Sequence, residues 1–277
     1  MKYSIKFYNG CRVLKDVDEI SIIYSEKDAQ LLKFAKKYKN ARIVADCTAL
    51  PQDSFIESLE IFETASKNFD FAVKIDFSQK DFIPNLKENA IKYFFVNKAN
   101  TLDKLVGFID LGVSDVYVAD ELGFYLAEIA QRCHDHGVSV RVYPNVAQSS
   151  SATKGDTFKY FYIRPEDVDI YEPYVDYMEF FGSIDRQSVL FKIYKEGQWL
   201  GSLNTLILGL EKEIPNTCIV PYFGQARVGC RKRCLSNQNC EVCNNIIGLA
   251  EVLENKDFGI TSERKRIDKR IEEEKDD

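Results

Sequence analysis

The residues best suited to chemistry are five cysteines gathered in one late stretch of the 277-residue chain. They are Cys218, Cys230, Cys234, Cys240 and Cys243. Eleven residues separate the first two, and the later intervals are three, five and two residues, so close pairs of thiolates can converge on one ion. Tetrahedral zinc and an iron–sulfur cluster both take four such ligands. The spacing therefore predicts a four-thiolate site with one cysteine to spare, and it leaves zinc and iron–sulfur both open.

The residues around these thiols are basic. They are Arg227, Arg231, Lys232 and Arg233, cations that would lower the thiol pKa values and offset the negative charge of bound thiolates. Met1 is followed by Lys2 and a strand-like run rather than by a secretory signal, so we expect a reducing, cytoplasmic location. A disulfide framework is not the default there. Redox-active disulfides and unligated thiols are the remaining alternatives to a metal site.

The other three cysteines, Cys11, Cys47 and Cys133, stand apart from this group. Isolated cysteines in folded proteins are usually small apolar fillers of the core, and we predict that role for all three. Cys47 has an alternative role, because it follows a predicted strand at residues 41–45 and could supply a remote fourth ligand.

The only histidines, His134 and His136, lie just before Gly137. A glycine at this point is a natural C-terminal helix cap, and imidazole suits the negative end of the helix dipole, so we predict a structural role for both. In a barrel that end of the helix faces away from the active site. Since the chain offers no other histidine, neither a Ser-His-Asp nor a Cys-His hydrolase is expected.

Eight short apolar runs alternate with amphipathic segments of helical length, which indicates a parallel sheet. The runs are residues 20–24, 41–45, 71–75, 93–96, 115–118, 139–142, 160–163 and 177–181. Their number and the chain length favour a closed (β/α)8 TIM-type barrel over an open doubly wound sheet, and no glycine-rich nucleotide-binding loop follows the first strands. A further strand-like run at residues 3–7 is predicted either to form a hairpin with the first barrel strand or to cover the bottom of the barrel.

Polar residues follow several of the predicted strands. They are Asp46, Asp76, Asn97, Asp120, Asn145 and Arg164. In a barrel these positions line the C-terminal rim, where barrel enzymes place their active sites, although Asp and Asn there also serve as helix caps and turn formers. The candidate catalytic residues at this mouth are Tyr143, Arg164 and Glu179. Arg164 could hold a carboxylate or phosphate in a bidentate fork, or it could instead anchor the next helix.

The predicted organisation has three parts: a barrel domain at residues 1–215 with an N-terminal extra strand, a cysteine-rich cluster-binding segment with a closing helix at 216–260, and a charged tail at 261–277. The formal net charge of -6 and the pI of about 5.3 argue against a general polyanion binder, while a local basic patch is compatible with them. No apolar stretch approaches the roughly 20 residues of a membrane helix, so no membrane partner is expected.

In three places the chain resembles the peptidase U32 family, the collagenase-like proteins that include ubiquinone-biosynthesis accessory proteins and RNA-hydroxylation proteins. The resemblance rests on residues 112–118, whose sequence GVSDVYV is similar to the family's glycine-led strand, and on residues 177–182, whose sequence is YMEFFG. It rests also on Cys218, Cys230 and Cys234, and it covers about residues 90 to 245.

This resemblance implies a 4Fe-4S cluster on four cysteines and support for hydroxylation of an aromatic ring or an RNA base, with a small aromatic molecule or RNA as the partner. The first three clustered cysteines carry over as ligands, and the fourth would be Cys240, Cys243 or Cys47. The alternative is a zinc-stapled barrel that acts as an RNA- or protein-binding module, and metal-dependent peptidase activity follows only from the family label. Whether the chain is an enzyme or an accessory protein stays open.

Overall fold

The computed structural model describes residues 1–7, 16–25, 29–147, 160–210, 214–219, 221, 223–228 and 230, which belong to two compact units. The first unit comprises Met1–Val118, Arg132–Val142 and Asp176–Glu179. The second comprises the described residues within 119–131, 143–175 and 180–230. The predicted closing helix and the charged tail at 261–277 lie outside the described residues.

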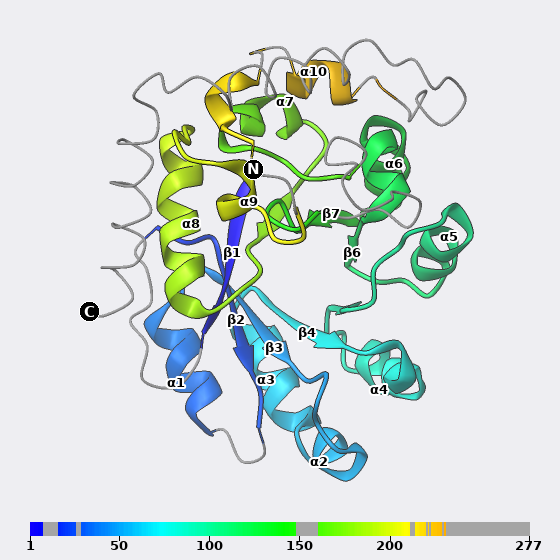
Figure 1. The fold of residues 1–277 in the computed structure, drawn as a ribbon. Coiled ribbons are helices and arrows are strands. Elements are labelled where there is room, and N and C mark those ends of the chain that lie inside the picture. The colour runs from blue at the N-terminus through cyan, green and yellow to red at the C-terminus, as the bar shows by residue number, and fades with distance from the viewer. Residues whose placement is uncertain are drawn as a thin grey trace. The chain divides into compact units, whose positions relative to one another are not determined.

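Eight parallel strands of the first unit close into a barrel (Figure 1). They are β1 (Lys2–Phe7), β2 (Glu19–Ile23), β3 (Arg42–Asp46), β4 (Phe71–Ile75), β5 (Tyr93–Phe95), β6 (Asp115–Tyr117), β7 (Ser139–Val142) and β8 (Tyr177–Glu179). Each strand pairs with the next in sequence, and β8 closes the ring on β1 by placing Met178 opposite Tyr3. The predicted barrel of the (β/α)8 type is therefore confirmed.

Helices of the first unit connect the strands and lie outside the ring (Figure 1). They are α1 (Ala29–Lys37), α2 (Gln52–Glu57), α3 (Leu59–Asn68), η1 (Phe77–Phe82), α4 (Ile83–Glu88) and α5 (Leu102–Asp110). In α5 the Thr101 side chain caps the first turn by accepting from the Lys104 amide at 3.3 Å, and Leu105, Phe108 and Ile109 are buried on one face. Among the described helices, none has the length and apolar character needed to cross a membrane.

Two of the strand predictions were wrong. Residues 3–7 are neither a hairpin partner nor a cover, because β1 is a full barrel strand that pairs in parallel with both β2 and β8. Residues 160–163, predicted to be a barrel strand, belong instead to the second unit. There Phe161 contacts the rings of Phe124 and Tyr171 at centroid distances of 6.1 and 6.3 Å. A short apolar run is buried equally well by such packing as by a sheet, so its composition does not identify a strand.

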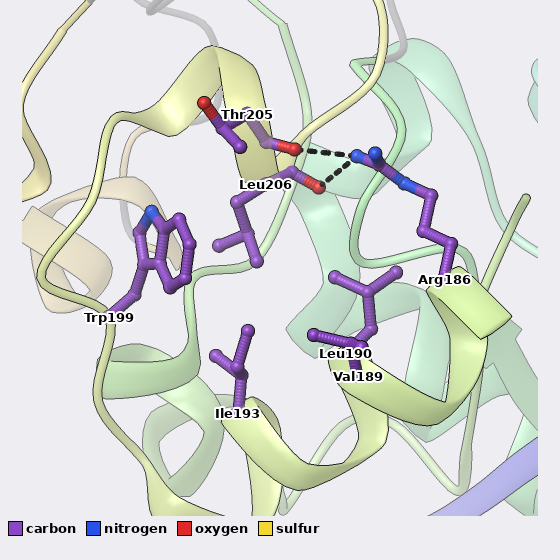
Figure 2. A pocket seen from close by; sticks show the side chains of 7 residues that line it. All are labelled: Arg186, Val189, Leu190, Ile193, Trp199, Thr205 and Leu206. Atoms are coloured by element: carbon purple, nitrogen blue, oxygen red, sulfur yellow. Dashed lines mark hydrogen bonds between the residues drawn. The ribbon is translucent and has the colours of Figure 1, made fainter. Parts of the chain in front are cut away.

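The second unit is built from helices. They are η2 (Asp120–Tyr125), the first turns of α6 (Leu126–Asp135), η4 (Pro165–Asp167), α7 (Val168–Tyr171), α8 (Ile184–Glu196), α9 (Leu203–Leu206), η5 (Asn216–Cys218) and α10 (Phe223–Val228). Figure 2 shows a small pocket between α8 and α9, where Leu190 and Leu206 face Trp199. At its edge Arg186 Nη2 donates to the carbonyl oxygens of Thr205 at 2.6 Å and Leu206 at 3.1 Å. The lining is largely apolar, so the pocket offers little for chemistry.

Candidate functional site

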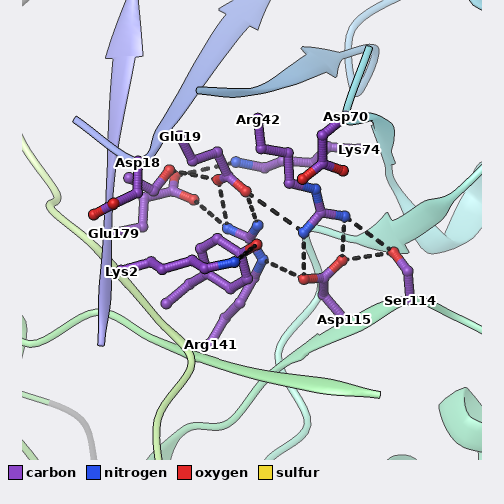
Figure 3. A network of polar contacts seen from close by, with 12 residues as sticks. Lys2, Asp18, Glu19, Arg42, Asp70, Lys74, Ser114, Asp115, Arg141 and Glu179 are labelled. Atoms are coloured by element: carbon purple, nitrogen blue, oxygen red, sulfur yellow. Dashed lines mark hydrogen bonds and ion pairs between the residues drawn. The ribbon is translucent and has the colours of Figure 1, made fainter. Parts of the chain in front are cut away.

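Charged side chains line the interior of the barrel, where branched apolar residues are usual. Those that are buried are Glu19, Arg42, Asp46, Lys74, Asp115, Arg141 and Glu179. Several of their contacts join strands that are not neighbours in the ring: Arg141 on β7, for example, binds Glu19 on β2 (Figure 3). Such contacts must cross the interior, so these side chains point inward. Their contacts and their positions along the strands divide them into two layers, which Arg141 links, because its Nη1 also lies 3.8 Å from Glu179 Oε2.

The amino-terminal layer consists of Glu19, Arg42, Asp115 and Arg141, the first three of which begin their strands. Arg42 binds Asp115 bidentately, with Nη1–Oδ1 and Nη2–Oδ2 distances of 2.7 Å. Arg141 Nη1 donates to Glu19 Oε1 at 2.8 Å, and Arg141 Nε lies 3.3 Å from Asp115 Oδ1. Two guanidinium groups and two carboxylates thus form a charge-balanced cluster. Its pairs have the bidentate geometry that the planar guanidinium of arginine favours.

These contacts keep Asp115 and Arg141 ionised. Burial alone would raise the pKa of Asp115, but the charges of Arg141 and Arg42 outweigh it and lower the pKa to about 2. Burial opposes the charge of Arg141 as well, and the nearby carboxylates nevertheless raise its pKa. The Arg141 guanidinium also lies between two rings, 4.3 Å from the Tyr177 centroid and 4.4 Å from that of Phe94. We assign this layer a structural role because its charges are held by one another.

The acid stability of the barrel should depend on Asp115. Its folded-state pKa of about 2 lies below the ordinary value of 3.8, so the ionised carboxylate stabilises the fold above about pH 4. This contribution, about 2 kcal/mol, is lost as the pH falls through about 2. In an Asp115→Asn variant that part of the pH dependence should be missing. Urea unfolding at a series of acidic pH values measures it, and an unchanged pH slope in the variant would contradict the assigned ionisation.

The carboxyl-terminal layer consists of Lys6, Asp46, Lys74, Tyr117 and Glu179, each the last or next-to-last residue of its strand. Lys74 Nζ lies 3.2 Å from Glu179 Oε1 and 3.3 Å from Asp46 Oδ2. The Tyr117 hydroxyl donates to Glu179 Oε2, and Lys6 Nζ lies 4.0 Å from Glu179 Oε1. Barrels of this type carry their active sites at the carboxyl ends of the strands, so this layer is the candidate site.

Glu179 is the centre of this layer. Burial would raise the pKa of its carboxyl, but the charges of Lys74, Lys6 and Arg141 and the hydrogen bond from Tyr117 lower the pKa below its ordinary value. Glu179 is therefore an ionised acceptor held between two proton donors, the Lys74 ammonium and the Tyr117 hydroxyl. Such an arrangement can orient a donor and transfer a proton, which general acid–base catalysis requires.

The side chains of the carboxyl-terminal layer differ in their exposure to solvent. The side chains of Lys6 and Asp46 are 23% and 10% exposed, whereas those of Lys74 and Glu179 are each 1% exposed. The Thr48 hydroxyl donates to Asp46 Oδ1 at 2.6 Å and fixes the orientation of that carboxylate. A substrate would therefore meet Lys6 and Asp46 first, with the buried Lys74–Glu179 pair behind them.

The other rim residues predicted from the sequence serve local structure. In the first unit Asp76 caps η1 by accepting from the Ser78 amide at 2.9 Å, and Asn97 donates to Asp76 at 3.1 Å. In the second unit the Asn145 side chain donates to the Phe181 carbonyl at 2.8 Å and accepts from the Phe181 amide at 2.9 Å. Asp120 opens η2 with a positive φ of 51°. Of the six predicted rim residues, Asp46 alone joins the carboxyl-terminal layer.

The three predicted catalytic residues belong to different units. Glu179 lies in the barrel interior of the first unit, whereas Tyr143 and Arg164 belong to the second. Arg164 is buried and binds Asp167 twice, with Nε–Oδ2 2.6 Å and Nη2–Oδ1 2.8 Å, as expected if it anchors the following helix. Tyr143 is buried and meets the Phe181 ring edge-on at 6.0 Å. Sequence reasoning missed Lys6, Lys74 and Tyr117, although all three interrupt or end strand runs.

The described cysteines give a partial view of the predicted metal site. Cys230 is a free, partly exposed thiol, and Cys218 ends η5. Cys234, Cys240 and Cys243 lie outside the described residues, as does Cys11. Within the described ranges no group of three or more His, Cys, Asp or Glu side chains is arranged to hold a metal ion.

The isolated cysteines Cys47 and Cys133 are buried free thiols, as predicted for core fillers. Burial raises the pKa of Cys133 to about 12, and burial together with Asp46 raises that of Cys47 well above its usual range. A thiol must lose its proton to bind a metal, so the environment of Cys47 opposes its alternative role as a ligand. The histidine prediction also fits, since His134 lies in the last turns of α6 and contacts Asp176 at 2.9 Å.

The residues near Cys230 suit a negatively charged centre. Arg227, three residues earlier, is buried, and its Nε and Nη1 groups have no hydrogen-bond acceptor among the residues that the structure describes. A thiolate centre beside such a cation would have its negative charge offset. The donor chemistry of the part of the segment that is described is therefore compatible with the predicted site.

The fold and the two layers define a parallel eight-stranded barrel protein with an ionic interior. Comparison with family models found no match to the chain, and comparison with curated proteins found none either.

Proposed function

We propose that this chain is a barrel enzyme whose carboxyl-terminal layer performs acid–base chemistry and whose cysteine segment binds a 4Fe-4S cluster. One observation carries the enzyme proposal: Lys74, Tyr117 and Glu179 are buried and ionisable, and Lys74 and Tyr117 both bind Glu179 at the carboxyl ends of barrel strands. The cysteine spacing and the resemblance to the peptidase U32 family support the cluster. On that resemblance we propose that the chain supports hydroxylation of an aromatic ring or an RNA base, in which a ring C–H becomes C–OH with oxygen from water while two electrons and two protons pass to an external organic oxidant.

The residues of the layer would bind and move protons. Glu179 holds the Tyr117 hydroxyl and the Lys74 ammonium in fixed positions, so neither donor needs to reorient during reaction. Lys74 also reaches Asp46, the member of the layer that accepts from Thr48 near the mouth. This gives a continuous path of hydrogen-bonding groups from the buried Tyr117 to the more exposed Asp46. A bound cluster would supply electron transfer.

The cofactor proposal is tested by anaerobic purification followed by measurement of iron, zinc and acid-labile sulfide. We expect a brown protein with broad visible absorbance and about four iron atoms per chain. Colourless protein with one zinc per chain would instead support the zinc-stapled module. Protein that takes up neither metal after reconstitution would refute a metal site in the cysteine segment.

Replacement of Cys230 or Cys234 by serine should release the metal. Each variant removes one thiolate from a four-ligand shell, and we expect bound metal to fall below about a tenth of the wild-type content. The matched control is Cys133→Ala, which removes a thiol that is buried in the first unit and should leave the metal content unchanged. Full metal content in either serine variant would show that the replaced cysteine is not a ligand.

The alternative function, an RNA-binding module, has less support than the enzyme proposal. That alternative uses the arginines around Cys230 to contact phosphates, which requires them to be accessible. Arg227 is only 5% exposed and lies against aromatic rings of its own unit. Among the described residues, the arginine nearest to Cys230 in sequence is therefore committed to the protein interior.

A further inference from the structure

Arginine and lysine are divided between the two layers of the barrel interior. The cations of the amino-terminal layer are Arg42 and Arg141, and those of the carboxyl-terminal layer are Lys6 and Lys74. Arginine keeps its charge at any ordinary pH and binds carboxylates through two nitrogens, which suits a layer that holds the fold together. Lysine is a weaker partner, but its amine can lose a proton and act as a nucleophile. The cations that can react therefore lie at the end of the barrel where enzymes of this fold place their active sites.

Lys74 makes longer contacts with its carboxylate partners than Arg42 does. Its Nζ lies 3.2 Å from Glu179 Oε1 and 3.3 Å from Asp46 Oδ2. The Arg42–Asp115 pair has two distances of 2.7 Å (Figure 3). Because charged hydrogen bonds weaken as they lengthen, the ammonium of Lys74 is held less tightly than the guanidinium of Arg42. The Asp46 side chain is 10% exposed, so the buried nitrogen lies one contact away from a carboxylate that reaches solvent.

The surroundings of Lys74 suit a cationic product as well as the ammonium. A lysine that condenses with a carbonyl compound forms a Schiff base, whose protonated iminium form carries the same positive charge as the ammonium that it replaces. The carboxylates of Asp46 and Glu179 would stabilise that charge in turn. The Tyr117 hydroxyl donates to Glu179, and the Tyr117 ring centroid lies 5.6 Å from Lys74 Nζ. A proton donor is therefore held beside the nitrogen.

We propose that Lys74 forms a Schiff base with an aldehyde or ketone substrate. Its ammonium transfers one proton to Asp46, and the neutral amine adds to the carbonyl carbon. The carbonyl oxygen takes one proton from Tyr117, which regains it from the nitrogen through Glu179, and a second proton from Asp46. The carbon–oxygen bond then breaks and the oxygen leaves as water. The nitrogen keeps one hydrogen, the new double bond to carbon and the positive charge.

Schiff-base formation goes beyond the proposed function. It requires the residues of the carboxyl-terminal layer, and it requires neither a bound cluster nor the cysteine segment. The reaction adds small carbonyl compounds as a substrate class and makes Lys74 the nucleophile.

The test treats the full-length protein with acetaldehyde and sodium cyanoborohydride, which reduces an iminium to a stable secondary amine. Peptide mass spectrometry then measures the rate of ethylation at individual lysines. The control in the same sample is Lys67, which also pairs with a glutamate but is 69% exposed. We expect ethylation of Lys74 to be about 10-fold faster than that of Lys67, although the Lys74 side chain is 1% exposed. A lysine with a structural role alone would react more slowly than Lys67, because burial restricts access of the reagents.

Tyr117→Phe tests the proton path. The variant keeps the ring and the charges around Lys74 but lacks the hydroxyl, so ethylation of Lys74 should be about 10-fold slower than in the wild type. The matched control is Tyr93→Phe, which makes the same change at the start of β5, where the hydroxyl donates to the Leu111 carbonyl. It should leave the Lys74 rate within about twofold of wild type. An unchanged rate in Tyr117→Phe would refute the path through Tyr117.

The wild-type comparison decides the proposal without any variant. Ethylation of Lys74 at or below the rate of Lys67 in folded wild-type protein would overturn the Schiff base, and a faster rate supports it. The result is also separable from the cofactor. Protein that binds no metal after reconstitution but ethylates Lys74 faster than Lys67 would refute the cluster and leave the Schiff base standing.

Discussion

Replacement of Arg141 by methionine is expected to lower the free energy of unfolding by about 3–5 kcal/mol, because it leaves the buried carboxylate of Glu19 without its main partner. Arg141 is fully buried, binds Glu19 through two nitrogens and lies 3.3 Å from Asp115. Methionine fills much of the volume but supplies neither charge nor hydrogen bonds. Urea unfolding monitored by circular dichroism measures the loss.

Two further variants show whether charge is the cause. Lys67→Met removes a cation from the exposed pair with Glu63, where the nitrogen–oxygen distance is 2.6 Å, and should cost less than about 1 kcal/mol. The double variant Arg141→Met with Glu19→Gln removes the carboxylate that the first change leaves with only the more distant Arg42 as a cation partner, at 3.6 Å, and should recover part of the lost stability. A loss in Arg141→Met no larger than in Lys67→Met would mean that the amino-terminal layer is not held by its ion pairs.

Replacement of Glu179 by glutamine is expected to reduce product formation by about 100-fold or more, as removal of a general acid–base group does. The amide keeps the size of the side chain but loses the negative charge that holds Lys74 and Tyr117. The measurement compares hydroxylated nucleosides and small aromatic compounds, by mass spectrometry, in cells that produce the wild type or the variant.

The matched control for this experiment is Glu63→Gln, which makes the same chemical change at a partly exposed carboxylate outside the layer. It should leave product formation within about twofold of wild type. Wild-type levels of product in a folded Glu179→Gln variant would show that the carboxyl-terminal layer is structural. Absence of any hydroxylated product from the wild type would instead refute the proposed reaction class.

Most barrel strands could be predicted because their outward-facing residues are apolar and are buried under the surrounding helices. In β4, Phe71, Val73 and Ile75 point outward while Lys74 points inward, and the apolar majority still indicates a strand. β1 was misassigned because its inward positions, Lys2, Ser4 and Lys6, are all polar, so that KYSIKF reads as a strand with one solvated face. A charged interior produces this pattern.

The charged interior also explains why the ion pairs of the two layers were not predicted. The signal was present in the sequence, since ionisable residues interrupt strand runs at Lys74 and Arg141, positions where solvent exposure is not expected. Their partners could not be predicted, however, because Arg141 binds a residue 122 positions away on a strand that is not its neighbour. Such pairs depend on the stagger of the whole ring, which strand patterns alone do not specify. Glu179 was identified as a mouth residue of the strand predicted at 177–181, without its partners.

The distribution of charges between the two halves of the barrel bears on how the chain folds. β1 to β4 contribute three cations and two anions to the layers, whereas β5 to β8 contribute one cation and two anions. Neither half is neutral by itself, and the bidentate pairs run between the halves. An isolated half-barrel would bury ions without counterions, so assembly from independently stable halves is disfavoured. Closure should wait for synthesis of β8, and the long sequence separations predict a slow, cooperative final step.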